Sequence, residues 1–149
     1  MLFQKIVGRR LLTACFGAVL AVGSVSNGYA EEYLCTTKPF ARGDAIAASM
    51  LIDVRHGLYA MIFDSYVKES HGAPVTAEIT RATSKKYDLT WQVRNLRIPA
   101  SAMSTQTDNG PVTVTYFASL NRKTMEFRVR ARAVGVANMG AEGKCVLRK

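Results

Sequence analysis

The sequence predicts an all-β domain: an antiparallel meander of seven or eight strands, closed as a barrel or folded as a sandwich. Three observations predict this fold class. Apolar and polar residues alternate at period two, which is the pattern of half-buried strands. Turn residues interrupt the alternation about every eight to twelve positions, a spacing typical of sandwiches and barrels. Two cysteines near the ends of the domain are placed to join those ends.

We expect the first 30 residues to be an export signal rather than part of the fold. Residues 1–10 are basic and carry no acid, residues 11–25 are apolar or small, and Gly28 and Ala30 stand where a signal peptidase reads small residues. The apolar run is shorter than the roughly 20 residues that span a bilayer. This predicts a cleavable signal peptide over residues 1–30 and a single β domain over residues 31–149. The alternatives are a retained anchor helix and a lipidated Cys15.

Cleavage near Ala30 would lower the net charge of the chain, and export would determine the compartment in which the protein acts. The chain has 20 basic residues, and removing Lys5, Arg9 and Arg10 leaves 17 against 11 acidic ones, a net charge of +6 in place of +9. Positive charge favours acidic partners, here an anionic envelope polymer or an acidic protein; the plainer interpretation is that it keeps a small domain soluble. We expect a periplasmic or secreted protein with no nucleic-acid partner and no transmembrane segment in the mature chain. The oligomeric state stays open.

The mature chain keeps two cysteines, Cys35 and Cys145. In an oxidising compartment two such cysteines are expected to pair. The bridge would close a loop of about 110 residues, for which the chain-entropy model gives somewhat under ~5 kcal/mol of stabilisation. Metal ligation and a reactive thiol are weaker interpretations, because no histidine stands beside either cysteine and no Cys-x-x-Cys spacing occurs. A bridge between the first and last strands favours a barrel.

The strands follow one another with short connections. Alternation predicts strands over residues 46–54, 58–63, 75–80, 87–94, 112–120 and 125–133, with a short last strand at 144–147. Turns are expected at 55–57 and 121–123, and loops at 70–74, 101–111 and 135–143. Residues 99–103 allow a short helix. Among the aromatic residues, Trp91, Tyr116 and Phe127 fall on inward sets and are expected in the core, or lining a small cavity if the barrel is wide. Phe117 falls on the opposite set, which indicates a second packed face or an exposed contact.

Candidate catalytic groups are few, and we expect no enzyme, no catalytic residue, no metal and no cofactor. His56 and His71 each stand beside a glycine in a predicted turn, where a solvated loop residue is the usual case. The sequence has no GxSxG elbow, HExxH helix or P-loop. A hairpin turning at residues 55–57 would allow Asp53 and Asp64 to form a carboxylate pair, although solvated sheet acids are the plainer interpretation.

The most distinctive surface feature is a row of three arginines, Arg128, Arg130 and Arg132. Period two places them on one face of one strand, about 6.5–7 Å apart. Guanidinium groups bind phosphates or carboxylates bidentately, so the row is a candidate binding surface. Arg122 and Lys123 in the adjoining turn are expected to extend it. The alternative is a solvated outer face that resists edge pairing.

Two resemblances rest on Tyr33-Leu34-Cys35, Gly143-Lys144-Cys145 and the hairpin at residues 119–123. The chain resembles a family of uncharacterised small exported proteins of alphaproteobacteria, which share the signal, a cysteine just after it, such a hairpin and a closing Gly-x-Cys; this resemblance implies no activity. Through Tyr33, Cys35 and Cys145 it also resembles the periplasmic C-type lysozyme inhibitors, which are small β-barrels with one such disulfide. This chain is longer, and none of its residues is matched to the inhibitory loop of that family.

Export, β architecture, a disulfide and the lack of catalytic motifs together predict a non-enzymatic binding module of the cell envelope, for an acidic polymer or protein. One alternative is a small-ligand carrier that uses a barrel cavity. A lysozyme-inhibitor-like protein and a hydrolase without a recognised motif are the others.

Overall fold

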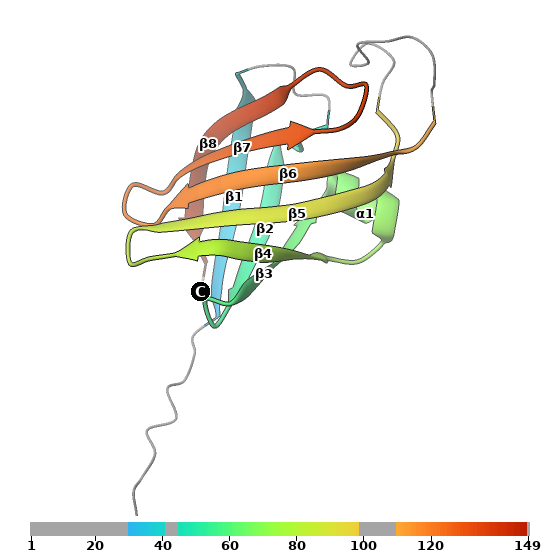
Figure 1. The fold of residues 1–149 in the computed structure, drawn as a ribbon. Helices are drawn as coiled ribbons and strands as arrows, with labels where there is room; N and C mark the ends of the chain where they lie inside the picture. The colour runs from blue at the N-terminus through green and yellow to red at the C-terminus, as the bar shows by residue number, and fades with distance from the viewer. Residues whose placement is uncertain (1–29, 41–44, 99–109, 149) are drawn as a thin grey trace, which may run out of the picture.

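The computed structural model describes residues 30–40, 45–98 and 110–148. These residues form one closed antiparallel barrel in which each strand pairs with the next and the last pairs with the first (Figure 1). The elements are β1 (Glu31–Pro39), β2 (Ser49–Arg55), β3 (Tyr59–Asp64), α1 (Ser65–His71), β4 (Val75–Ala82), β5 (Lys86–Leu96), β6 (Val112–Asn121), β7 (Glu126–Arg132) and β8 (Met139–Leu147). The all-β prediction is confirmed, and of its two forms the barrel is the right one. The predicted signal peptide, apart from Ala30, and the possible helix at 99–103 lie outside the described residues, as does nearly all of the predicted loop at 101–111.

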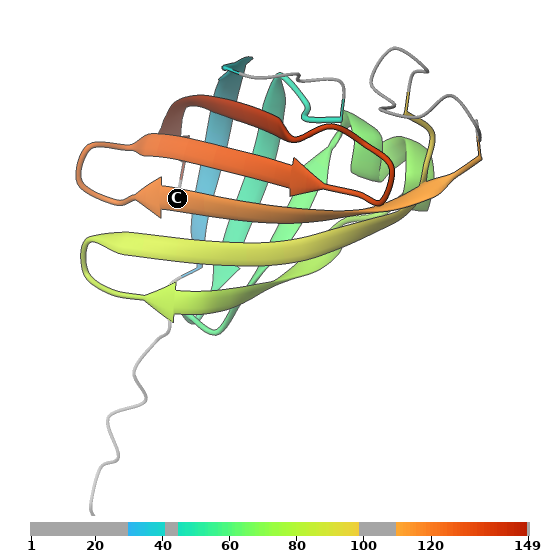
Figure 2. The ribbon, with the colours of Figure 1, turned by 45° about the horizontal axis from the view of Figure 1, so that its top comes forward.

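The strands of the barrel cross at a steep angle. β5, β6 and β7 run across one side, and β1, β2 and β3 cross behind them (Figure 2). The inward side chains of both sides meet in one hydrophobic cluster. Within this cluster the rings of Trp91 and Tyr116 stack 5.0 Å apart at an interplanar angle of 4°, and the Tyr116 hydroxyl donates to the Ala45 carbonyl at 2.7 Å. The prediction of Trp91, Tyr116 and Phe127 as core residues is confirmed, since their side chains are at most 3% exposed.

The β2–β3 hairpin turns where it was predicted. His56 and Gly57 have φ values of 52° and 67°, and the Leu58 N–H donates to the Arg55 carbonyl at 3.0 Å. Positive φ at both central residues is the type I′ geometry, whose twist matches that of the flanking strands. His56 is therefore a turn residue.

The ends of the domain differ from the prediction. Residues 31–39 form β1, a strand that was not predicted, so Cys35 lies within a strand that precedes the predicted one at 46–54. The predicted loop at 135–143 is wrong in its second half, because β8 begins at Met139. Small residues there indicated a loop, but Gly143 is small for a packing reason: a Cβ on it would lie 1.8 Å from the Thr36 carbonyl oxygen of β1. Glycine inside a strand often marks such a close backbone approach.

The disulfide lies on this β1–β8 seam. Cys35 and Cys145 stand directly opposite each other in the register and are bonded. The predicted bridge is confirmed, and it joins the two strands whose pairing closes the barrel.

The helix α1 was not predicted. Its seven residues are too few to show a helical period. Asp64 caps its start by accepting from the Val67 N–H at 2.9 Å, and Gly72 ends it with φ of 70° while donating to the Lys68 carbonyl at 3.0 Å. Val67 is fully buried, so the helix covers part of one end of the barrel.

Candidate functional site

The outward face of β7 carries the three arginines. Arg128, Arg130 and Arg132 alternate with side chains that are at most 1% exposed, so the arginines point away from the core. The apolar alternation of β7 fixes this face, because charged side chains are almost never buried without a partner. The arginines therefore stand together on the outside of the barrel.

Two phenyl rings lie on the same rung of the sheet as Arg130. Phe117 of β6 is directly opposite Arg130 on one side, and Gly140 of β8 is opposite on the other. Phe40 covers Gly140: its N–H donates to the Gly140 carbonyl at 3.1 Å, and a Cβ on Gly140 would lie 2.5 Å from the tip of the ring. Glycine at this position thus makes room for Phe40. Phe117 and Phe40 are 43% and 47% exposed, so Phe117 is an outer-face residue.

The rings hold two of the guanidinium groups. Arg128 lies over the Phe40 ring, 5.5 Å from its centroid, and Arg132 lies over the Phe117 ring at 5.4 Å. Cation–π contacts of this kind are attractive even at exposed sites. Both rings lie level with Arg130 along the strand. Arg128 leans toward this level on the β8 side of Arg130, and Arg132 leans toward it on the β6 side. We call Phe40, Phe117, Arg128, Arg130 and Arg132 the basic aromatic face.

The basic aromatic face keeps most of its charge unneutralised. Arg128 pairs with Glu142 of β8 at 2.9 Å, but both side chains are more than half exposed, and exposed pairs are worth little. Within the described part of the chain, Arg130 and Arg132 have no carboxylate partner. Glu126 stands two positions before Arg128 on the same outward face of β7, opposite Lys144 in the register, and Asp88 of β5 is paired with Lys86 at 2.9 Å. An anion approaching Arg130 therefore meets cations that are still available.

Two hollows flank Arg130. One of about 180 Å³ is lined by Phe40, Arg130, Arg132, Ala131, Asn138 and Met139. The other, of about 280 Å³, includes Phe117, Arg128 and Arg130 in its lining, together with the acid Asp88. Each hollow combines one phenyl ring with two guanidinium groups, and Arg130 belongs to both.

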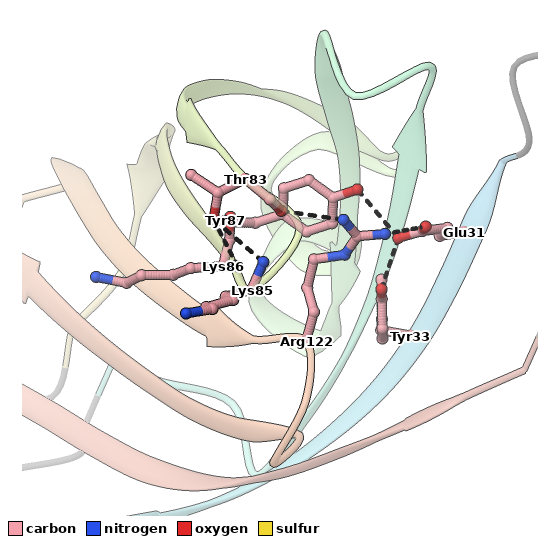
Figure 3. Close-up of polar contacts among 7 residues, drawn as sticks. All are labelled: Glu31, Tyr33, Thr83, Lys85, Lys86, Tyr87 and Arg122. Carbon is pink, nitrogen blue, oxygen red and sulfur yellow. Dashed lines mark hydrogen bonds and ion pairs between the residues drawn. The ribbon is translucent and has the colours of Figure 1, made fainter.

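Arg122 does not extend the row as expected. It lies at one end of the barrel, where it pairs with Glu31, donates to the Thr83 carbonyl at 3.0 Å and stacks over Tyr87 at 4.6 Å (Figure 3). Glu31 also accepts from the hydroxyls of Tyr33 at 2.6 Å and Tyr87 at 3.1 Å. We call these four residues, Glu31, Tyr33, Tyr87 and Arg122, the end cluster.

The end cluster is a closed set of partners. Burial, followed by the hydrogen bond to Glu31, raises the pKa of Tyr33 to about 12. Burial and then the charge of Glu31 also raise the pKa of Tyr87. Burial acts to lower the pKa of Arg122, but its contacts with the two tyrosines and Glu31 outweigh that effect and raise it. At neutral pH the tyrosines stay protonated and the arginine charged, so the cluster ties β1 to two hairpin ends.

Lys123 is exposed in the β6–β7 turn. Its backbone N–H donates to the Asn121 side-chain oxygen at 2.9 Å, which shapes the turn. The turn lies at the end of the barrel, beyond the start of β7, so Lys123 stands apart from the rung of Arg130.

The other candidates do not assemble a reactive site. Asp53 pairs in register with Met61 and Asp64 with Met50, and the two acids lie on opposite faces of the hairpin. His71 at the end of α1 accepts from the Arg94 N–H at 3.2 Å. Among residues 30–40, 45–98 and 110–148, no three His, Cys, Asp or Glu side chains gather as a metal site requires.

Comparison with models of protein families, with curated proteins and with solved structures gives no match to this chain. No helix of the described residues is long and apolar enough to cross a membrane.

Sequence reasoning missed two residues that matter here, Phe40 and Glu31. Phe40 reaches the basic aromatic face through the pairing of β1 with β8, and Glu31 reaches Arg122 across 91 positions. Neither contact leaves a local pattern in the sequence.

Proposed function

We propose that this protein is an exported, non-enzymatic binding module of the cell envelope, and that its basic aromatic face binds an acidic polymer or an acidic protein. One observation carries the proposal: Arg130 and Arg132 are exposed and have no carboxylate partner among the described residues, on a face where phenyl rings hold the guanidinium groups of Arg128 and Arg132. Guanidinium groups recognise phosphates and carboxylates through paired hydrogen bonds.

Two observations support a location outside the cytoplasm. A disulfide fits an oxidising compartment, and the pattern of residues 1–30 is that of a secretory signal. A periplasmic or secreted location would expose the barrel to the anionic polymers and lipids of the envelope.

The alternatives have less support. A carrier needs an interior cavity, whereas the inward side chains of the described strands pack into one cluster that includes the stacked rings of Trp91 and Tyr116. The resemblance to lysozyme inhibitors rests on three residues and supplies no inhibitory loop, so it carries no assignment of activity.

The test replaces the three arginines with serine and measures binding to anionic vesicles over a range of salt concentrations. Each cation near an anionic surface is worth about 1 kcal/mol. We therefore expect R128S/R130S/R132S to bind roughly 100-fold more weakly at low salt, and its salt dependence to be flatter.

The matched control is K68S/R94S/R97S, which removes the same charge from exposed cations on α1 and at the end of β5. It should lose much less binding. Equal losses in the two triple variants would show that net charge, rather than this face, drives the association, and unchanged binding of R128S/R130S/R132S would contradict the proposal outright.

A further inference from the structure

We propose that a groove on the outside of β3, β4 and β5 binds an uncharged oligosaccharide, which stacks on the ring of Tyr59 and accepts hydrogen bonds from, and donates them to, side chains of β4 and β5. The inference goes beyond the proposed function, because it concerns another part of the barrel wall and another class of ligand. It follows from how the groove is formed, from what lines it and from how its charges balance.

The groove exists because β4 changes its partner strand. Val75–Glu78 pair with β3 and Glu78–Ala82 pair with β5, so within β4 only Glu78 is paired on both sides. Toward the start of β4 the described residues form no ladder pair with β5, although β5 runs on past this level. The Arg94 N–H in this stretch of β5 donates to the His71 side chain at 3.2 Å rather than to a strand. The wall therefore opens into a groove of about 600 Å³.

The lining of the groove combines one aromatic ring with polar side chains. Tyr59 lies on one side and is 41% exposed. The two strands that part supply the polar groups, which are those of Thr76, Glu78, Thr90, Gln92 and Arg94. A saccharide presents an apolar C–H face that can cover an aromatic ring, and hydroxyl groups at its rim that both donate and accept hydrogen bonds. Apolar surface with a few placed polar groups is typical of small-molecule sites.

Several of these polar groups have no protein partner. Among the described residues, no side-chain hydrogen bond or ion pair engages Tyr59, Glu78 or Thr90. The Gln92 amide donates to the Thr115 hydroxyl at 3.4 Å, and its oxygen remains available as an acceptor. A ligand with several hydroxyl groups would therefore find both donors and acceptors along the groove.

The charges of the groove offset each other. Glu78 and Arg94 are the charged residues of its lining, one of each sign. Two arginines beside the groove, Arg55 and Arg81, each pair with an aspartate. An uncharged ligand matches this balance, whereas an anion or a cation would leave one of the two lining charges opposed. Binding in the groove should therefore depend little on salt, in contrast to binding on the basic aromatic face.

Isothermal titration calorimetry tests the groove with two uncharged probes, the glucose oligomer cellotetraose and the N-acetylglucosamine oligomer chitotetraose. We expect at least one of them to bind, with an affinity that changes less than about twofold between low and high salt. Y59L removes the ring but keeps an apolar side chain, and it should weaken binding about tenfold. F117L removes a ring of similar exposure, 43%, from the basic aromatic face and should leave the affinity unchanged.

Three results would overturn the inference. They are the absence of binding of both probes to the unaltered protein, equal losses in Y59L and F117L, and binding that R128S/R130S/R132S abolishes, because this last result would place the saccharide on the basic aromatic face. If Y59L does not fold, Q92L takes its place, and an unchanged affinity in that variant would contradict the site. Each of these failures leaves the proposed function intact, since vesicle binding is tested on other residues.

Discussion

Asp64 shows how one buried side chain serves the fold at a cost. Its carboxylate caps α1 through the Val67 N–H at 2.9 Å, and it lies on the inward face of β3. Burial raises the pKa of Asp64 above its ordinary value of 3.8, although hydrogen bonds from the Val67 and Tyr66 backbone oppose the shift. Because the folded state holds the proton more tightly, the stability that this group contributes is present at low pH and is lost as the pH rises through the raised pKa.

The raised pKa of Asp64 predicts how the stability of D64N depends on pH. Asparagine keeps the capping oxygen but has no charge to bury, so the variant should gain stability relative to the unaltered protein between pH 3 and pH 7. D64A loses the cap and should cost about 1 kcal/mol. Urea denaturation at both pH values measures the difference. A stability difference between D64N and the unaltered protein that does not change with pH would contradict the account.

The seam between β1 and β8 carries the prediction at the scale of elements. Gly143 of β8 faces the backbone of β1 so closely that a methyl group would overlap the Thr36 carbonyl oxygen. Backbone cannot move aside as a flexible side chain can. We therefore expect G143A to lower the free energy of unfolding by about 2–4 kcal/mol, measured by thermal or chemical denaturation.

Gly110 provides the control for that substitution. A Cβ on Gly110 would meet nothing within 4 Å, so G110A should change stability by no more than about 0.5 kcal/mol. If G143A proved as mild as G110A, the close approach on the β1–β8 seam would be wrong.

The elements divide into those with a local pattern and those without one. Strand β7 was predictable because its inward residues alternate without a break and Asn121 marks the turn before it, and β5 was predictable as far as Val93, where a bulge at Asn95 interrupts the alternation. The helix α1 was not, since only Val67 of its seven residues is buried. The early part of β8 was not predicted because its small residues indicated a loop. In the structure they are small because the backbone of β1 and the Phe40 ring lie close to them.

At the scale of the whole molecule, closure of the barrel determines which side chains surround each basic residue. The sequence predicted one face for the three arginines of β7, and it also predicted that Arg122 would join them. In the structure Arg122 belongs to the end cluster. Arg122 directly follows the last residue of β6, and its side chain reaches Glu31, Tyr33 and Tyr87. The alternation within β7 could not predict the pairing of Arg122 with Glu31, because Glu31 lies on β1 and comes near only when β1 pairs with β8.

The same closure makes the candidate site more than a row of charges. Phe40 reaches Arg128 only because β1 pairs with β8, and β8 in turn pairs with β7. The arginines could be predicted from sequence, while the rings that gather their guanidinium groups on one rung could not be recognised as such. The disulfide between Cys35 and Cys145 secures the pairing on which this arrangement depends.

The central claim is that acidic partners bind the outer face of β6–β8, and nuclear magnetic resonance tests it most directly. Protein labelled with nitrogen-15 is titrated with anionic vesicles while the backbone amide and arginine side-chain signals are followed. If acidic partners bind this face, broadening should begin at Phe117, Arg130 and Gly140. Broadening centred on Lys85 and Lys123 at the end of the barrel, with the signals of Arg130 unchanged, would contradict it.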